Sequence, residues 1–211
     1  MNHNEDRFVG AGGRSIYYQS WAPETSPRAM ILVVHGLGEH SARYQYLASY
    51  FVARDYVVGA LDLNGHGYSG GRPGYVEAFT DYEDDLALFH EVMVERFPQV
   101  PVFLLGHSMG GLISCCYLRA TQDRFSGAML SGAAVITSQQ PGAIEMWLIR
   151  LLSRVIPRLG LTRLDAGGVS RDPDEVTKYV EDPLVYHGAL SARLLHEFFG
   201  SMRSLRASAG K

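Results

Sequence analysis

Cysteine is nearly absent from this 211-residue chain, which has only Cys115 and Cys116. Two adjacent cysteines cannot form the paired framework of a small secreted domain, so the sequence excludes a disulfide-stabilised scaffold. No apolar run approaches the roughly 18 residues that a membrane-spanning helix needs. The polar and acidic residues 1–7 also differ from a secretory signal. From these absences we expect a soluble, cytoplasmic protein.

Charge is also sparse, since charged residues make up 19% of the chain and the net charge is −3. Nucleic-acid binding needs a concentrated positive face, and no basic block occurs, so no nucleic-acid partner is predicted. The hydrophobic content of 46% is typical of a globular protein and excludes a disordered or fibrous chain. A chain of this length can bury a sizeable core.

The first half alternates short apolar runs with longer helical patterns. Continuous apolar runs predict buried strands at residues 29–34, 57–61, 101–105 and 127–130. Apolar residues at helical spacing predict helices at residues 41–54, 79–97 and 110–119. The aromatic-rich residues 14–21 alternate imperfectly and predict a half-exposed strand near a sheet edge. This order predicts an α/β fold, a mostly parallel sheet with helices on both faces.

The pattern changes after Ser131, beyond which no strand is predicted. Residues 145–161 form an amphipathic helical pattern, and a shorter helix is predicted at residues 191–199. One side of the longer helix carries Trp147, Leu148, Leu151, Leu152 and Val155. We therefore expect a core at residues 1–135, a helical cap insertion at 136–200 over the sheet's C-terminal edge, and the start of a further core segment at 201–211.

Two segments match the nucleophile pattern G-x-S-x-G, around Ser108 and around Ser69. Ser108 follows a predicted buried strand and precedes a predicted helix, which is the strand–turn–helix context that the motif requires. Ser69 lies in a glycine-rich loop without either neighbour. The sequence therefore predicts that Ser108 is a catalytic nucleophile and Ser69 a loop residue.

Backbone N–H groups near Ser108 are the expected oxyanion donors. Met109 follows the nucleophile at a helix N-terminus, and Leu37 lies in the Gly-rich loop after the strand 29–34. We predict that the N–H groups of Met109 and Leu37 stabilise the developing oxyanion.

The histidines of this chain are poor candidates for the general base. His107 and His66 are expected to fix loops, and His90 to pack or face solvent. His187 and His196 lie in the cap insertion, where a base would be badly oriented. Asp165, Asp172, Asp174 and Asp182 lie in the same insertion and are expected to cap helices or fix loops.

Three motifs together resemble the monoacylglycerol lipases. They are His35-Gly-Leu-Gly-Glu-His-Ser-Ala-Arg-Tyr44, Asp62-Leu-Asn-Gly-His-Gly-Tyr-Ser-Gly70 and Gly106-His-Ser-Met-Gly-Gly111, and residues 172–188 are similar to the cap of these lipases. The chain is similar to this branch of the α/β-hydrolase superfamily, which also holds lysophospholipases and serine aminopeptidase-like hydrolases. The resemblance implies Ser108 as nucleophile, Leu37 and Met109 as oxyanion donors, an apolar cap, and no metal or organic cofactor.

The chain departs from this family in one respect. The superfamily places an Asp or Glu and then a His on loops that follow the nucleophile, and no such loops occur before Lys211. We therefore expect that the last two strand units are missing and that this is the N-terminal three-quarters of such a hydrolase.

The leading hypothesis is a serine hydrolase that cleaves carboxylic esters of acylglycerols or lysolipids through an acyl-enzyme. Trp147, Leu148, Leu151 and Leu152 are the expected acyl-chain contacts, and we expect the cap to touch membrane surfaces transiently. Two alternatives stay open: a peptidase or small-ester hydrolase of the same fold, and a truncated, non-catalytic acyl-binding module.

Overall fold

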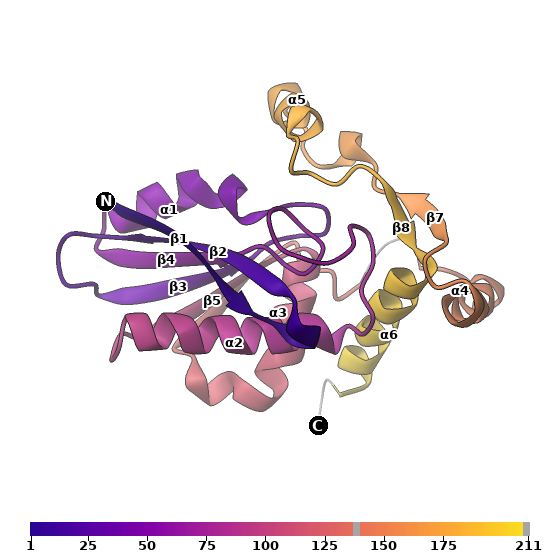
Figure 1. The fold of residues 1–211 in the computed structure, drawn as a ribbon, viewed down its shortest axis with the longest axis horizontal. Helices are drawn as coiled ribbons and strands as arrows, with labels where there is room; N and C mark the ends of the chain where they lie inside the picture. Colours follow the sequence, from indigo (N-terminus) through magenta and orange to yellow (C-terminus); the bar gives the residue numbers. More distant parts are fainter. Residues whose placement is uncertain (137–139, 209–211) are drawn as a thin grey trace.

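A six-stranded sheet forms the centre of the protein (Figure 1), whose computed structural model describes residues 1–136 and 140–208. The strands lie in the order β1-β2-β4-β3-β5-β6. Their bounds are β1 Asn2–Val9, β2 Ser15–Ala22, β3 Ala29–Val34, β4 Tyr56–Leu61, β5 Val102–His107 and β6 Gly127–Ser131. The pairs β4–β3, β3–β5 and β5–β6 are parallel, whereas β1 and β2 join antiparallel.

Helices cover both faces of this sheet, as the sequence predicts. Helix α1 (Gln45–Val52) lies on one face, and α2 (Thr80–Arg96) and α3 (Met109–Thr121) lie on the other (Figure 1). Every residue of β3 is buried. Met30, Leu32 and Val34 join the core under α2 and α3, while the alternate residues Ile31 and Val33 join the core under α1. The predicted mostly parallel sheet with helices on both faces is confirmed.

The N-terminal edge differs from the prediction. Strand β2 was expected to be half-exposed at an edge, but β1 pairs outside it and six consecutive residues of β2, Ile16–Trp21, are buried. Strand β1 has the sequence NHNEDRFV and is mostly exposed. Charged residues protect an edge strand from further pairing, and they also remove the hydrophobic alternation by which a strand is predicted.

The cap contains more structure than the sequence indicates. It consists of α4 (Ala143–Val155), α5 (Pro173–Glu181), the first part of α6 (Ala192–Ser208), and the antiparallel pair β7 (Gly160–Arg163) and β8 (Ala189–Ser191). The expectation of no strand beyond Ser131 is therefore wrong, because both cap strands are too short to show a periodicity. Helix α6 crosses the predicted boundary at residue 200. Short 3-10 helices are η1 (Ala11–Gly13), η2 (Ser41–Tyr44), η3 (Gln122–Arg124) and η4 (Ala166–Gly168).

The cap elements gather at one end of the sheet, with α4 alongside α6 and α5 farther out (Figure 1). Helix α4 is shorter than predicted because Ile156 leaves helical geometry just before Pro157. Helix α5 was not predicted, although Asp172 caps it and Pro173 begins it. In the described part of the chain, none of the helices combines the length and apolarity that crossing a membrane requires.

A pH dependence of stability is expected from His90 of α2. This residue is 2% exposed, its ring stacks on Phe125, and its Nδ1 lies 3.4 Å from the hydroxyl of Tyr117. Burial lowers the pKa of His90 to about 4, and the nearby Arg124 lowers it further. The unfolded chain therefore binds a proton at His90 near pH 6.5, whereas the folded protein binds it only near pH 4. As the pH falls from 6.5 toward 4, this difference lowers the free energy of unfolding.

We expect His90→Phe to remove this cost. Between pH 7 and pH 5 the wild type should lose about 2 kcal/mol of unfolding free energy relative to the variant, measured by urea denaturation at each pH. The comparison between proteins is needed because Asp85 titrates in the opposite sense, burial raising its pKa to about 6. If the unfolding free energies of the wild type and His90→Phe changed with pH in parallel, the pH dependence could not be assigned to His90.

Candidate active site

Ser108 occupies a sharp turn between β5 and α3. Its backbone has φ +50° and ψ −116°, which is strained for a residue with a side chain. The surrounding chain holds the turn: the Ser108 N–H donates to Ser131 O at 3.0 Å, and the Ser108 carbonyl accepts from the N–H groups of Gly111, Leu112 and Ala134. The strained turn predicted for the nucleophile is therefore present, and β6 and the loop after it fix it from one side.

Glycines allow the loop after β3 to approach this turn closely. A Cβ built on Gly36 would lie 3.3 Å from Ser108 Cβ, and a Cβ on Gly110 would lie 2.1 Å from the carbonyl oxygen of Val34. The start of α3 therefore packs directly against the end of β3. This contact explains why Gly36, Leu37 and Ser108, far apart in the sequence, border one cavity.

The two expected oxyanion donors belong to the chain segments that follow β3 and β5. Leu37 and Met109 line the same cavity as Ser108. The N–H of Met109 is in the first turn of α3, where backbone donors have no partner within the helix. Among the described residues, neither of these N–H groups has a hydrogen-bond acceptor. The geometry is compatible with an oxyanion hole, whose catalytic role stays a prediction.

A carboxylate that the sequence analysis did not single out borders the nucleophile. Glu39 lines the Ser108 cavity and accepts hydrogen bonds from the Gly36 N–H at 3.3 Å and the Tyr44 hydroxyl at 3.2 Å. Its other oxygen lies 3.9 Å from His107 Nε2. Burial and the Glu39 charge both raise the pKa of Tyr44. Glu39 therefore links the loop that carries Leu37, which we call the oxyanion loop, to η2. The sequence signal that marked Glu39 was its position at the end of the segment His35-Gly-Leu-Gly-Glu39.

His35 connects the loops after β3 and β4. Its Nδ1–H donates to Gly36 O at 2.7 Å, and its Nε2 accepts from the Leu63 N–H at 2.9 Å. This pairing requires the neutral ring, and burial, followed by the nearby His66, lowers the pKa of His35 well below its usual value. His35 therefore acts as a neutral bridge that positions the oxyanion loop.

The other predicted loop residues also make loop-fixing contacts. Ser69 accepts from the Tyr17 N–H and donates to Asp62 O, which confirms it as a loop residue. His66 bonds Asn64 O, and His107 bonds the backbone and side chain of Ser131. Within residues 1–136 and 140–208, no histidine is hydrogen-bonded to Ser108.

The aspartates and histidines of the cap make local contacts, and among the described residues none of them is bonded to Ser108. Asp165 accepts from Gly167 N–H, Asp172 caps α5, and Asp182 binds His40 at 2.8 Å. His187 packs edge-on against Tyr179, and His196 lies in a groove between α4 and α6. The expectation that these aspartates cap helices or fix loops is confirmed for the three that make these bonds. In the described ranges, no set of three His, Cys, Asp or Glu side chains is arranged to hold a metal ion.

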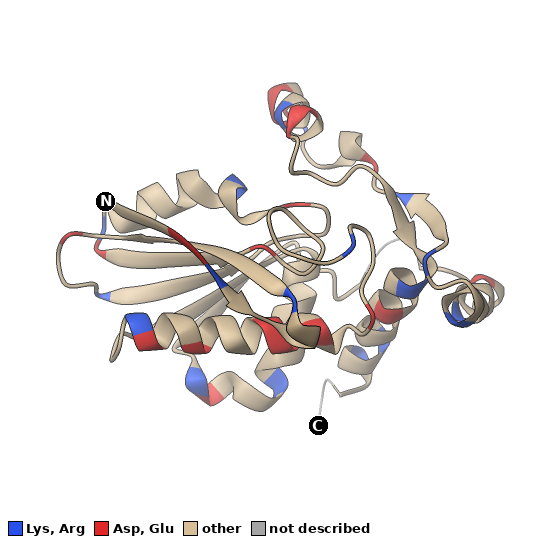
Figure 2. Ribbon diagram, in the orientation of Figure 1, with Lys and Arg blue, Asp and Glu red and all other residues tan. Residues whose placement is uncertain are grey.

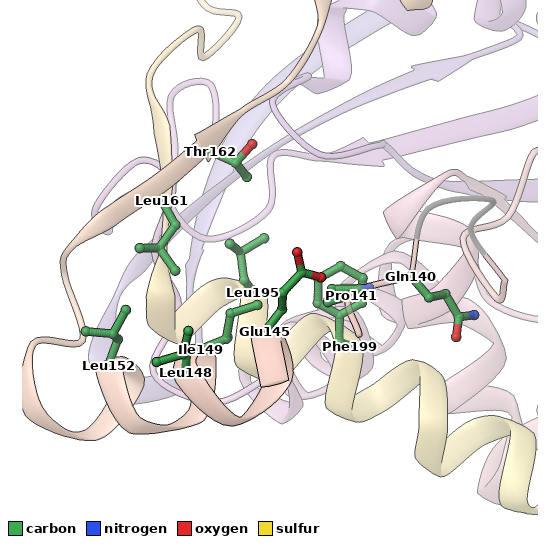
Figure 3. Close-up of a pocket in the computed structure, with 10 residues that line it drawn as sticks. All are labelled: Gln140, Pro141, Glu145, Leu148, Ile149, Leu152, Leu161, Thr162, Leu195 and Phe199. Carbon is green, nitrogen blue, oxygen red and sulfur yellow. The ribbon is translucent and has the colours of Figure 1, made fainter. Parts of the chain in front are cut away.

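Core and cap together enclose a cavity of about 520 Å³ over Ser108. Its cap side is mostly apolar, with the following residues: Leu164, Val169, Tyr179, Leu190, Leu194, Leu195, Phe198 and Phe199. A second cavity of about 570 Å³ lies between α4, β7 and α6 (Figure 3). Leu195 and Phe199 line both cavities, so the two meet at α6. Each has the size of a small-molecule site, about 300–1,000 Å³.

The expected acyl-chain residues separate into two groups. Leu148 and Leu152 line the second cavity, where Figure 3 draws both on α4. Trp147 lines a different groove, and Leu151 is 43% exposed and lines neither cavity. The contribution of α6 to the Ser108 cavity was not predicted, although the residues concerned follow helical spacing: Leu194, Leu195, Phe198 and Phe199.

The chain is similar to known proteins in both sequence and structure. The family model described as serine aminopeptidase, S33, matches residues 25–211. The chain is 35% identical over 202 residues to a monoacylglycerol lipase of Mycolicibacterium smegmatis, covering 96% of this chain and 72% of that protein. It is 36% identical over 184 residues to the monoglyceride lipase of Rattus norvegicus, covering 87% of this chain and 61% of that protein.

A solved structure has a similar fold. The monoacylglycerol lipase of Paleococcus ferrophilus superimposes with a TM-score of 0.78 at 31% identity, over 92% of this chain and 72% of that one. The chain thus spans between 61% and 72% of the length of these relatives. The chain belongs to the family described as serine aminopeptidase, S33, and monoacylglycerol and monoglyceride lipases are among its relatives.

Proposed function

We propose that the whole protein is a serine hydrolase that cleaves carboxylic esters of monoacylglycerols or related lysolipids. The observation that carries this proposal is the strained Ser108 turn, with the Leu37 and Met109 N–H groups beside it, under a mostly apolar cavity. The names of the relatives support the lipid substrate class.

The geometry suits a reaction in two halves. Ser108 Oγ attacks the ester carbonyl carbon, and negative charge develops on the carbonyl oxygen, where the N–H groups of Leu37 and Met109 stabilise it. The carbon–oxygen bond to the alcohol then breaks, the alcohol leaves with a proton, and an ester forms at Ser108. Water attacks this acyl-enzyme, which releases the fatty acid and returns the proton to Ser108. The positive end of the α3 dipole favours the same charge.

We further propose that the acyl chain runs from Ser108 past Leu195 and Phe199 into the second cavity. Leu148 and Leu152 then contact its distal methylenes, and Trp147 and Leu151 lie outside this path. The core at residues 1–135 supplies the chemistry and the cap at 136–200 supplies the apolar surface.

Leu152→Asp tests this path. Each buried methylene contributes about 0.8 kcal/mol, so a carboxylate in the second cavity should lower kcat/KM for long-chain monoacylglycerols by roughly 10- to 100-fold while sparing short-chain esters. Val180→Asp is the matched control, because Val180 is a cap residue that is 51% exposed and lines neither cavity. The measurement is kcat/KM over a series of acyl lengths. An equal loss for short and long chains with Leu152→Asp would contradict the path.

Aminopeptidase activity is the second candidate, because two carboxylates, Glu39 and Asp165, line the Ser108 cavity. A substrate amine needs such a group to hold its charge. Both carboxylates are already engaged, with the Gly36 and Gly167 N–H groups respectively, which favours the ester substrate. A panel of monoacylglycerols, lysophospholipids, p-nitrophenyl esters and aminoacyl amides decides between them. Turnover of the amides alone would overturn the lipid-ester proposal.

The cap is also the part of the protein that we propose to contact membrane surfaces, since lipid esters reside in bilayers and micelles.

A further inference from the structure

Helix α6 begins where the cap returns to the core, and it forms part of the wall of both cavities. Leu195 and Phe199 line both of them, and α6 packs against α3 on one side and α4 on the other (Figure 1). A displacement of the first turn of α6 would therefore change the apolar space above Ser108. The contacts that hold this turn against the core thus bear on how a substrate fits.

Backbone hydrogen bonds tie the start of α6 to two other segments. The Ser191 N–H, at the end of β8, donates to Gly74 O in the core at 2.9 Å. The Arg193 N–H, in the first turn of α6, donates to Pro157 O at 3.0 Å, in the connection between α4 and β7. The residues where β8 passes into α6 are therefore a junction between core and cap.

The side chain of Arg193 joins core and cap by charge at the same place. Its Nη2 donates to Glu77 Oε1 at 2.9 Å, and its Nη1 lies 3.7 Å from Glu197 Oε1. The other oxygen of Glu197 accepts from the Phe79 N–H at 3.2 Å, just before α2 begins. Figure 2 shows basic and acidic positions together in the first turns of α6. Arg193 therefore links a carboxylate of the core to a carboxylate of α6 that itself binds the core.

The Glu77 carboxylate is also held from the core side. It accepts a hydrogen bond from the Tyr75 hydroxyl, and the guanidinium of Arg158, a cap residue, lies 5.9 Å from the centre of the Tyr75 ring. Hydrogen bonds from Tyr75 and then from Arg193 lower the pKa of Glu77, which keeps this carboxylate ionised at neutral pH. A single exposed ion pair contributes little, whereas a network of several charges with defined partners can fix a geometry.

We propose that Arg193 is a positioning residue for the acyl site: its ion pairs hold the first turn of α6 against core residues 74–79 and so fix the apolar wall above Ser108. Arg193 itself lines neither cavity. It acts through its neighbours Leu194 and Leu195, which are buried and line the Ser108 cavity. The effect on hydrolysis rests on the proposed function, whereas the anchoring of α6 does not.

The test compares Arg193→Gln, Glu77→Gln and the double variant in the whole protein. Either single change removes the link, so KM for p-nitrophenyl laurate should rise roughly fivefold, the largest effect typical of a partly exposed ion pair. The kcat for p-nitrophenyl acetate should stay close to that of the wild type, because the acetyl group is too short to need the wall. The double variant should show no larger rise in KM than either single variant, since both changes remove one interaction. Arg193→Lys keeps the charge and should recover part of the loss.

Arg171→Gln is the matched control, because Arg171 is an exposed cap arginine outside both cavities. Hydrogen exchange at the Ser191 N–H is measured in parallel and needs no substrate. It should be faster in Arg193→Gln than in the wild type and unchanged in Arg171→Gln. Unchanged exchange in Arg193→Gln, or an equal rise in KM for both esters, would overturn the positioning role. If the wild type hydrolysed neither ester while exchange rose as expected, the proposed function would be rejected and the anchoring of α6 would stand.

Discussion

Replacing Ser108 by alanine is expected to abolish ester hydrolysis by the whole protein and its labelling by a fluorophosphonate probe. The hydroxyl is the only group on the strained turn that can form the acyl-enzyme, and removal of a catalytic serine lowers turnover by roughly 10⁶-fold. The fold should survive, because the turn is held by the backbone groups of Ser108, which alanine keeps. Circular dichroism and urea denaturation check this, and turnover and probe labelling check the catalytic role.

Ser69→Ala is the matched control, since Ser69 lies in the second G-x-S-x-G sequence. Its hydroxyl bridges Tyr17 N–H and Asp62 O, so its loss should lower stability by about 1–3 kcal/mol and leave labelling intact. If both variants lost labelling while folded, or if Ser108→Ala kept it, the nucleophile would be misassigned.

The central sheet could be predicted because its strands are buried on both faces and read as continuous apolar runs. β3 was predicted with the bounds that it has. Strand β1 could not be predicted, because this exposed edge strand carries charged residues and lacks an alternation of apolar and polar residues. The cap strands β7 and β8 are four and three residues long, and their pairing depends on the tertiary fold of the cap.

The candidate site divides in a similar way. The meeting of Ser108, Leu37 and Met109 at one cavity could be predicted, because glycines in the sequence mark the turns that hold them, while their catalytic roles stay predictions. Glu39 and the α6 residues were not assigned a role, because a motif position or a helical spacing does not show which segments meet in space. Tyr44 illustrates the point: its hydroxyl reaches Glu39 only because η2 turns the chain back.

The contact between α3 and β3 gives the second prediction. Gly110→Ala should lower kcat by about 100-fold or more and lower the unfolding free energy by about 1–3 kcal/mol. The new Cβ would lie 2.1 Å from Val34 O and 2.5 Å from His35 O, and these backbone atoms cannot move aside as a side chain could. The start of α3 must therefore shift away from β3, which separates the N–H of Met109 from that of Leu37.

Gly200→Ala is the matched control, because Gly200 is also within a helix but a Cβ there would meet nothing within 4 Å. It should stabilise the protein by about 0.8–1 kcal/mol, since alanine is the better helix former. Urea denaturation and kcat for a soluble ester are measured for both variants. Opposite signs of the stability change, with activity lost only for Gly110→Ala, are expected because one glycine is required by close packing and the other is not. If Gly110→Ala kept wild-type turnover, the oxyanion loop would not depend on this contact. A different N–H group would then have to be assigned as the second oxyanion donor in place of Leu37.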